Sequence, residues 1–111
     1  MAIFSSHLLN SVNGTHASGV KVIIHQIKKS GEKNTFFETE TDKEGRILKD
    51  FELSNDDCGC DYEMVCKTAD YFSKKKIVSE IIIKFRMEDP EKKYHLPIII
   101  SPNGYSIWWS Q

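Results

Sequence analysis

The feature that most constrains the fold of this chain is the period-two pattern of residues 80–87. Alternate positions are apolar without exception, and most of the positions between them are charged. The apolar positions are Ile81, Ile83, Phe85 and Met87, and the opposite set is Ile82, Lys84 and Arg86. Because successive side chains of a β-strand point to opposite faces, this pattern predicts a strand with one face buried and the other in water.

Other segments of similar length are also rich in strand-forming residues and are bounded by turns. Within residues 20–27, for example, Val20, Val22 and Ile24 share one face. The predicted strands are residues 3–9, 20–27, 35–41, 46–48, 62–67, 80–87, 94–100 and 105–109. Short strands at this spacing predict an all-β fold, a β-sandwich, in one domain that spans residues 1–111.

Turn and helix signals complete this prediction. The Asn-Gly pair at residues 13–14 predicts a hairpin turn after the first strand, and Pro-Asn-Gly at 102–104 predicts that the last two strands form an antiparallel hairpin. Residues 69–76 are the one helical candidate; Asp70 would open this helix and a run of lysines would close it. Residues 54–60 are polar and predict a loop.

Charge and hydropathy argue against two classes of partner. The chain has 15 Lys and Arg against 16 Asp and Glu, so no positive excess exists to hold a phosphate backbone, and nucleic-acid binding is not expected. No apolar run approaches the roughly 20 residues of a membrane-spanning helix, so no membrane partner is expected. The first residues lack the basic start and apolar core of a signal peptide, and we expect a cytoplasmic protein.

The cysteine pattern agrees with a reducing compartment. Cys58, Cys60 and Cys66 are odd in number and close together, which argues against a disulfide framework. A Cys-Gly-Cys pair can bind a metal through its thiolates, but no second pair has the spacing of a zinc site, so no metal is expected. Cys66 lies in a predicted strand beside Val65 and is interpreted as a core residue.

Candidate catalytic groups come from three distant parts of the chain. His7 lies in the first predicted strand, Arg46 follows a glycine turn, and His95 lies in an otherwise apolar strand. The other two histidines, His16 and His25, have no supporting context and are interpreted as structural.

Hydrolysis is the chemistry that such a set supports if a sandwich brings its members together. A neutral imidazole can take a proton from water near pH 7. An arginine can hold an anionic or carbonyl oxygen and stabilise the charge that develops on it. A second imidazole can return a proton to a leaving nitrogen. This combination suits the opening of a cyclic amide without a metal or a cofactor.

Several segments from both ends and the middle of the chain form one ordered set of motifs. They are residues 4–10 (FSSHLLN) with 17–20 (ASGV), 41–46 (TDKEGR), 62–72 and, most strongly, 94–106 (YHLPIIISPNGYS). These segments resemble the 5-hydroxyisourate hydrolases, the enzymatic relatives of transthyretin, and the resemblance covers almost the whole chain in order. It implies a prealbumin-like sandwich of about eight strands with one short helix. It also implies a homotetramer with its active sites in a groove between dimers.

The resemblance also implies an activity and a set of site residues. The family hydrolyses 5-hydroxyisourate, a product of urate oxidation in purine catabolism, without a cofactor. Its catalytic histidine, arginine and histidine match His7, Arg46 and His95. The implied substrate-binding residues are His7, Arg46, Ser106 and Trp108.

The chain departs from the family pattern in two places. The family's His-Tyr-His has Lys93 at its first position, and its Tyr-Arg-Gly-Ser is Trp-Trp-Ser-Gln at residues 108–111. Trp108 therefore stands where the family has a substrate-contacting tyrosine and offers only an N–H donor. Three alternatives follow: a site retuned for a different cyclic substrate, a small-molecule carrier like transthyretin, or tryptophans that pack at a subunit contact.

Overall fold

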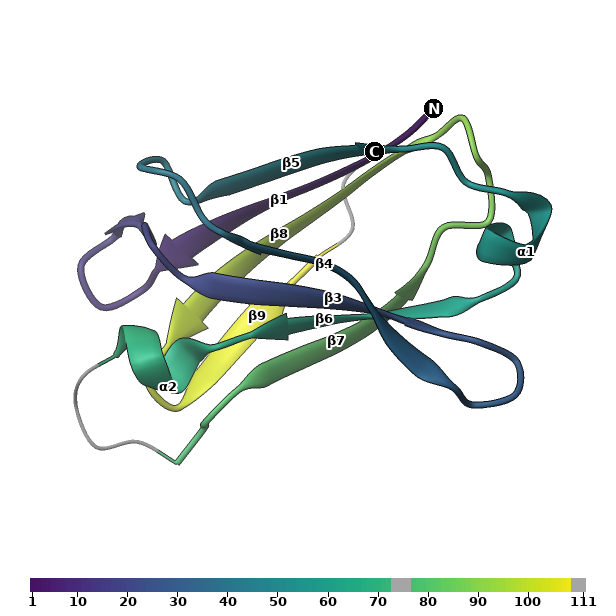
Figure 1. The fold of residues 1–111 in the computed structure, drawn as a ribbon. Coiled ribbons are helices and arrows are strands. Elements are labelled where there is room, and N and C mark those ends of the chain that lie inside the picture. The colour runs from purple at the N-terminus through teal and green to yellow at the C-terminus, as the bar shows by residue number, and fades with distance from the viewer. Residues whose placement is uncertain (73–76, 109–111) are drawn as a thin grey trace.

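The computed structural model describes residues 1–72 and 77–108 and forms a sandwich of two β-sheets (Figure 1). This confirms the predicted fold class. The described residues contain nine strands and two short helices rather than about eight strands and one helix. Neither helix has the length or apolar character needed to cross a membrane.

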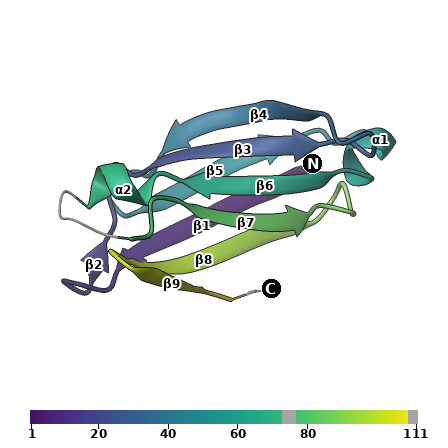
Figure 2. The ribbon, with the colours of Figure 1, turned by 90° about the horizontal axis from the view of Figure 1, so that it is seen from below.

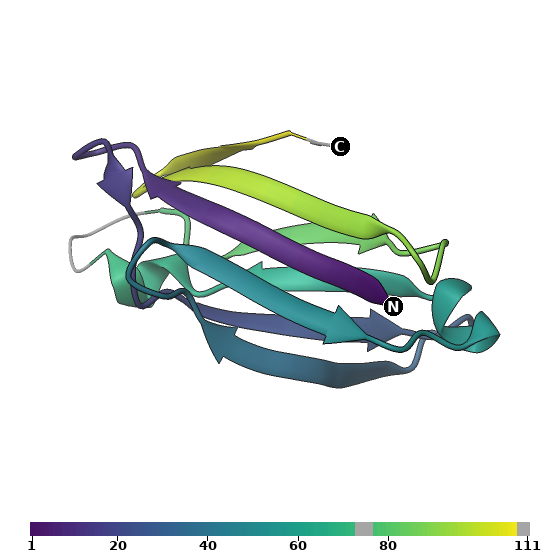
Figure 3. The same cartoon turned by 90° about the horizontal axis from the view of Figure 1, so that it is seen from above.

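The first sheet, here called the β1 sheet, carries the candidate site. Figure 3 shows four of its strands side by side in the order β5, β1, β8, β9. The strands are β1 (Ala2–Asn10), β2 (Thr15–His16), β5 (Arg46–Phe51), β8 (Lys93–Ser101) and β9 (Gly104–Ile107). β1 and β8 are parallel, and the other pairs are antiparallel. β5 and then β2 pair with successive parts of one edge of β1, while β8 occupies its other edge.

The second sheet, the β3 sheet, lies against the inner face of the first (Figure 2). Its order is β4 (Lys33–Glu40), β3 (Lys21–Ile27), β6 (Asp61–Cys66) and β7 (Ile81–Arg86), and all its pairs are antiparallel. The two predicted hairpin turns are confirmed, since residues 11–14 join β1 to β2 and residues 102–103 join β8 to β9.

The core between the sheets follows the predicted alternation. Val20, Val22 and Ile24 are fully buried, as are Ile81 and Met87, whereas their neighbours of opposite parity are more exposed. Aromatic rings from the two sheets pack against one another in the core. Phe4 of β1 stacks on Phe85 of β7 with ring centroids 5.3 Å apart, and Tyr62 of β6 lies 5.7 Å from the same ring. Cys66 is fully buried, which confirms its interpretation as a core residue.

Two local predictions are wrong. Residues 54–60 contain the helix α1 (Asn55–Cys58), because the Ser54 hydroxyl accepts from the Asp57 backbone and the Asp57 carboxylate accepts from the Ser54 backbone, a capping box. The second helix, α2 (Thr68–Tyr71), begins at Thr68 and not at Asp70, and it ends at Tyr71. The lysines predicted to close it are Lys74, Lys75 and Lys76, which lie outside the described part of the chain.

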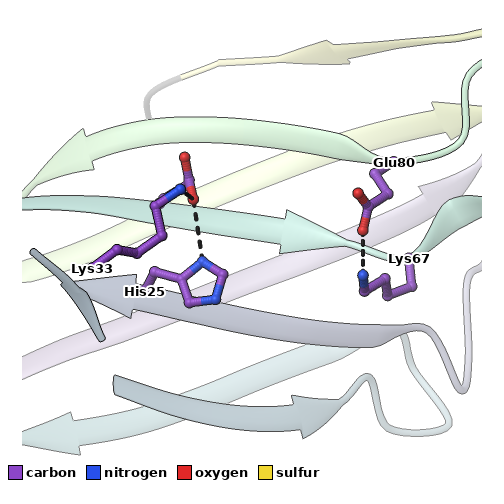
Figure 4. Close-up of polar contacts among 5 residues, drawn as sticks. His25, Lys33, Lys67 and Glu80 are labelled. Atoms are coloured by element: carbon purple, nitrogen blue, oxygen red, sulfur yellow. Dashed lines mark hydrogen bonds and ion pairs between the residues drawn. The ribbon is translucent and has the colours of Figure 1, made fainter. Parts of the chain in front are cut away.

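The outer face of the β3 sheet holds a buried carboxylate that pairs with a histidine and a lysine (Figure 4). Oε2 of Glu63 on β6 lies 3.1 Å from Nδ1 of His25 and 3.0 Å from Nζ of Lys33. Only 6% of Glu63 is exposed. Burial acts to raise the pKa of Glu63, but the hydrogen bonds from Lys33 and His25 outweigh it, so the pKa lies below the ordinary value of 4.5. Lys67 and Glu80 form a second ion pair on this sheet.

The turn before β5 determines where Arg46 lies. The Asp42 carboxylate accepts from the backbone N–H groups of Glu44 and Arg46, both at 2.9 Å. Gly45 adopts φ +73°, a left-handed conformation that favours glycine. A Cβ at Gly45 would come within 2.4 Å of the Leu8 carbonyl oxygen and 3.1 Å of the Ala17 nitrogen. Glycine therefore lets this turn press against β1 and the chain that follows β2.

We expect Gly45→Ala to lower the free energy of unfolding by about 3 kcal/mol, because it combines a left-handed residue with a backbone clash. Gly19→Ala is the matched control. Gly19 has φ +75° but no atom within 4 Å of an added Cβ, so it should cost only about 1–2 kcal/mol. Urea unfolding of both variants measures the difference. Equal losses would show that the contact with Leu8 and Ala17 does not matter.

We expect Glu63→Gln to lower the free energy of unfolding at pH 7 by about 1–2 kcal/mol. The folded structure holds the pKa of Glu63 below its ordinary value of 4.5. The stability that its carboxylate contributes is therefore complete above pH 4.5 and is lost as the pH falls through the lower pKa of the folded state. The difference from wild type should therefore shrink in a urea series as the pH is lowered below 4.5. Asp61→Asn, which breaks the exposed pair with Arg86, is the control and should have a smaller effect. A Glu63→Gln deficit that persists in acid would contradict the assignment.

Candidate active site

The three predicted catalytic side chains share the outer face of the β1 sheet. His7 and Arg46 are directly paired across β1 and β5. His95 of β8 is paired with Ser5, which lies two residues before His7 and therefore on the same face. The proximity of the charges is reflected in the pKa of each histidine, which Arg46 lowers. Residues distant in sequence are thus brought to one surface by strand pairing.

A groove of about 390 Å³ opens on this face. Its walls come from β1, β5 and β8 and are formed by Ser5, Ser6, Arg46, Ile47, Leu48, Lys93 and His95. Two of the three predicted catalytic residues line it, and His7 lies outside its wall. A larger hollow of about 590 Å³ beside α1 contains none of the predicted site residues, so the smaller groove is the better candidate on chemical grounds.

His95 is oriented by a serine that the sequence analysis did not identify. Ser5 Oγ lies 2.8 Å from Nδ1 of His95. This hydrogen bond occupies Nδ1, and Nε2 is the ring nitrogen that it does not use. Burial lowers the pKa of His95, and the nearby charges of Arg46 and Lys93 lower it further. The ring is therefore neutral at pH 7 and is able to accept a proton.

His7 contacts a second histidine. Its Nε2 lies 3.0 Å from Nδ1 of His16, and the two ring centroids are 5.1 Å apart. The structure therefore places His16, interpreted as structural from the sequence, in contact with a candidate catalytic residue. Burial lowers the pKa of His7, and Arg46 and His16 act in the same direction. His25, by contrast, lies on the other sheet and belongs to the Glu63 cluster.

Arg46 keeps its guanidinium largely available. Its backbone N–H is held by Asp42, whereas the side chain is 51% exposed and its Nε is 3.9 Å from the exposed Glu44 carboxylate. An ion pair of this length and exposure is weak. The guanidinium can therefore exchange this contact for an oxygen of a bound molecule.

The predicted substrate-binding residues Ser106 and Trp108 do not line the groove. Ser106 is paired with Ile99 on β9 and β8, so by alternation it lies on the same sheet face as His95. Trp108 follows β9 and is 46% exposed. The remaining residues of the divergent tail, Trp109, Ser110 and Gln111, lie outside the described part of the chain.

The sequence did contain a signal for His16. The hairpin signal at residues 13–14 implies that the chain folds back along the end of the first strand. In the observed register, Leu9 is opposite His16, which makes His7 and His16 diagonal neighbours on one face. No comparable local signal exists for Ser5, because its contact depends on the pairing of β1 with β8, 90 residues away.

The described residues show no metal centre. Within residues 1–72 and 77–108, no three His, Cys, Asp or Glu side chains gather in a way that would hold a metal ion. The side chains of the groove instead offer an imidazole, a guanidinium, an ammonium and hydroxyls. These groups can transfer protons and hold a negatively charged or carbonyl oxygen.

Comparisons with known proteins agree with this chemistry. The profile of the HIUase/Transthyretin family matches residues 4–109. A 5-hydroxyisourate hydrolase from Salmonella typhimurium is 34% identical, over 96% of this chain and 79% of the relative. The structure of Klebsiella pneumoniae 5-hydroxyisourate hydrolase is similar over both complete chains, with a TM-score of 0.80 and 27% identity. Sea bream transthyretin, solved in complex with thyroxine, has a TM-score of 0.83 over 96% of this chain and 93% of its own; at 20% identity it supports the fold alone. This chain belongs to the HIUase/Transthyretin family.

Proposed function

We propose that this protein is a hydrolase that opens the cyclic amide ring of 5-hydroxyisourate in purine catabolism. The observation that carries the proposal is the groove in which Arg46 and His95 face one space on the outer surface of the β1 sheet. Relatives named 5-hydroxyisourate hydrolase that match nearly the whole chain support the same substrate.

The electrostatics of the groove suit the negative charge that develops during amide hydrolysis. Arg46 and Lys93 are cationic, and none of the residues that line the groove carries a carboxylate. The outer face of the β3 sheet differs, because Lys33 and Lys67 there are paired with glutamates. A guanidinium with only a weak, exposed partner can leave that partner to stabilise an oxyanion. A guanidinium in a tight ion pair would first have to break that pair, at a higher cost in free energy.

The proposed reaction uses His95 as the base. We assign the tautomer in which Nδ1–H donates to Ser5 Oγ, because it leaves the lone pair of Nε2 free. Nε2 takes a proton from water as the water oxygen bonds to the amide carbon, and Arg46 holds the resulting oxyanion. When the carbon–nitrogen bond breaks, the His95 imidazolium returns this proton to the leaving nitrogen, and the neutral His7 is the second imidazole on this face. Water is thereby added across the amide, and the enzyme returns to its starting state.

Two further properties belong to the proposal. We propose a homotetramer with the site at the contact between dimers, which the exposed apolar surface of the β1 sheet supports. Leu48 in the groove wall is 72% exposed, and Trp108 after β9 is 46% exposed. We also propose a cytoplasmic location, supported by the free thiols of Cys58, Cys60 and Cys66.

Substituting Arg46 by alanine tests the site. Because the guanidinium is expected to hold the oxyanion, Arg46→Ala should lower kcat/KM for freshly generated 5-hydroxyisourate by about 10²–10³-fold, measured by ultraviolet absorbance. Urea unfolding should be nearly unaltered, since the turn is held by the Arg46 backbone and not by its side chain. Lys43→Ala, in the same turn, is the control and should keep its activity. Full activity in Arg46→Ala would refute the proposed site, and binding without turnover by the wild type would favour a carrier.

The mass of the protein in solution tests the proposed assembly. Light scattering should give about four times the chain mass of 12.8 kDa. Leu48→Glu, which places a charge on the exposed apolar wall, should shift this mass to a smaller species because a charge is costly in a buried contact. Lys84→Glu on the other sheet is the control and should leave the mass unaltered. A wild-type mass equal to one chain would contradict the tetramer.

A further inference from the structure

The imidazole pair formed by His7 and His16 is built by the hairpin that joins β1 to β2. Gly14, at φ +72°, closes the turn by donating its N–H to the Asn10 carbonyl at 2.9 Å. The Asn13 side chain accepts from both the backbone and the hydroxyl of Thr15, at 3.0 and 2.8 Å. The residue before His16 is therefore held by the turn itself.

The chain after His16 is anchored as well. The Ala17 N–H donates to the Leu8 carbonyl at 2.9 Å, and the Ala17 carbonyl accepts from the buried hydroxyl of Thr41 at 2.6 Å. Ala17 is fully buried. With both flanks fixed, the exposed His16 is held beside His7 by main-chain geometry.

Two ring nitrogens 3.0 Å apart share one hydrogen. If both carried one, the two N–H groups would face each other with no acceptor between them. The pair can therefore hold one positive charge but not two without losing its hydrogen bond. Nε2 of His7 and Nδ1 of His16 must have opposite roles, one as donor and one as acceptor.

The main chain of Glu44 selects between these two arrangements. A hydrogen bond between the Glu44 main chain and the His7 ring raises the pKa of His7. A main-chain group raises the pKa of a histidine only when its carbonyl accepts a hydrogen from the ring. Since Nε2 faces His16, we assign this bond to Nδ1–H of His7. In the neutral pair, Nε2 of His7 is then the acceptor, Nδ1–H of His16 is the donor, and Nε2 of His16 carries the free lone pair.

We propose that His16 is a positioning residue for the hydrolysis at this site: it holds His7 as a neutral imidazole with its proton on Nδ1, and its own Nε2 is where the pair exchanges a proton. A proton that arrives at Nε2 of His16 makes that ring an imidazolium. Nδ1–H of His16 still donates to Nε2 of His7, so the charge stays on the outer ring and His7 stays neutral. This role rests on the proposed function, because it serves the reaction in which His7 is the second imidazole.

The surroundings of His7 favour the neutral ring. The charged and titratable groups that act on it come from β2, β5, β8 and the turn before β5. They are His16, Arg46, His95, and the carboxylate of Asp42 together with the main chain of Glu44. Arg46, His95 and His16 disfavour a positive charge on His7, and Asp42 and the Glu44 carbonyl favour it. His16 is thus one of three neighbours from three strands that oppose protonation of His7.

The test is a nuclear magnetic resonance titration of the histidine rings in the full chain, combined with the pH dependence of kcat/KM for 5-hydroxyisourate. In His16→Phe the shared hydrogen and the neighbouring charge are lost. His7 should then take up its proton at higher pH, and the acidic limb of kcat/KM should move in the same direction. At pH 7, kcat/KM should fall about tenfold, as the ring loses its orientation and more of it is protonated. His16→Asn restores one donor at the position of Nδ1 and should recover part of the lost kcat/KM. If His16→Phe does not fold, the same measurements are made on His16→Asn.

His25→Phe is the matched control, because His25 is on the other sheet and should leave the titration of His7 unaltered. An unaltered His7 titration in His16→Phe, or a shifted titration with an unaltered pH profile, would overturn the positioning role. If the wild type does not hydrolyse 5-hydroxyisourate, the proposed function fails. The titration of His7 would still show whether His16 controls its protonation, so the two failures are distinguishable.

Discussion

The hydrogen-bond pairing of β1 with neighbours on both edges is the constraint on which the rest of this structure depends. On one edge β1 meets β5 and then β2, and on the other it runs parallel to β8. Each pairing brings one functional group to the same face: Arg46, His16 and His95. A slip of one residue in any register would turn that side chain to the opposite face. The site therefore depends on the registers of three strand pairs.

Close packing of main chain at one junction links those registers. Leu8 accepts from Ala17 and its N–H donates to Gly45, so β1 is joined there to the chain beyond β2 and to the turn before β5. Only glycine fits at position 45, because the space for a Cβ is filled by the Leu8 carbonyl. The same junction thus positions Arg46 and supports His16. A single contact between backbones connects the guanidinium to the imidazole pair.

Charged side chains are arranged differently on the two outer faces of the sandwich. On the β3 sheet, Glu63 is buried with His25 and Lys33, and its pKa is lowered. On the β1 sheet, cationic and imidazole groups gather beside a groove whose lining includes no carboxylate. Paired charges stabilise a fold, whereas a positive charge with only a weak, exposed partner lowers the pKa of nearby imidazoles and is available to a negative oxygen. This difference separates a structural face from one suited to catalysis.

The sequence alone predicted eight of the nine described strands, the buried faces of β3 and β7, and the family, because a period of two and the TDKEGR and YHLPIIISPNGYS segments are local properties. It also indicated His7, Arg46 and His95 as candidate catalytic residues, but it indicated only a structural role for His16. It missed α1, whose capping box lies in a polar segment, and it missed Ser5. Only the tertiary structure decided that Ser5 orients His95 and that the groove lies between β5 and β8 across β1. Parallel pairing of residues 90 positions apart leaves no local pattern, so no inspection of either segment by itself reveals that contact.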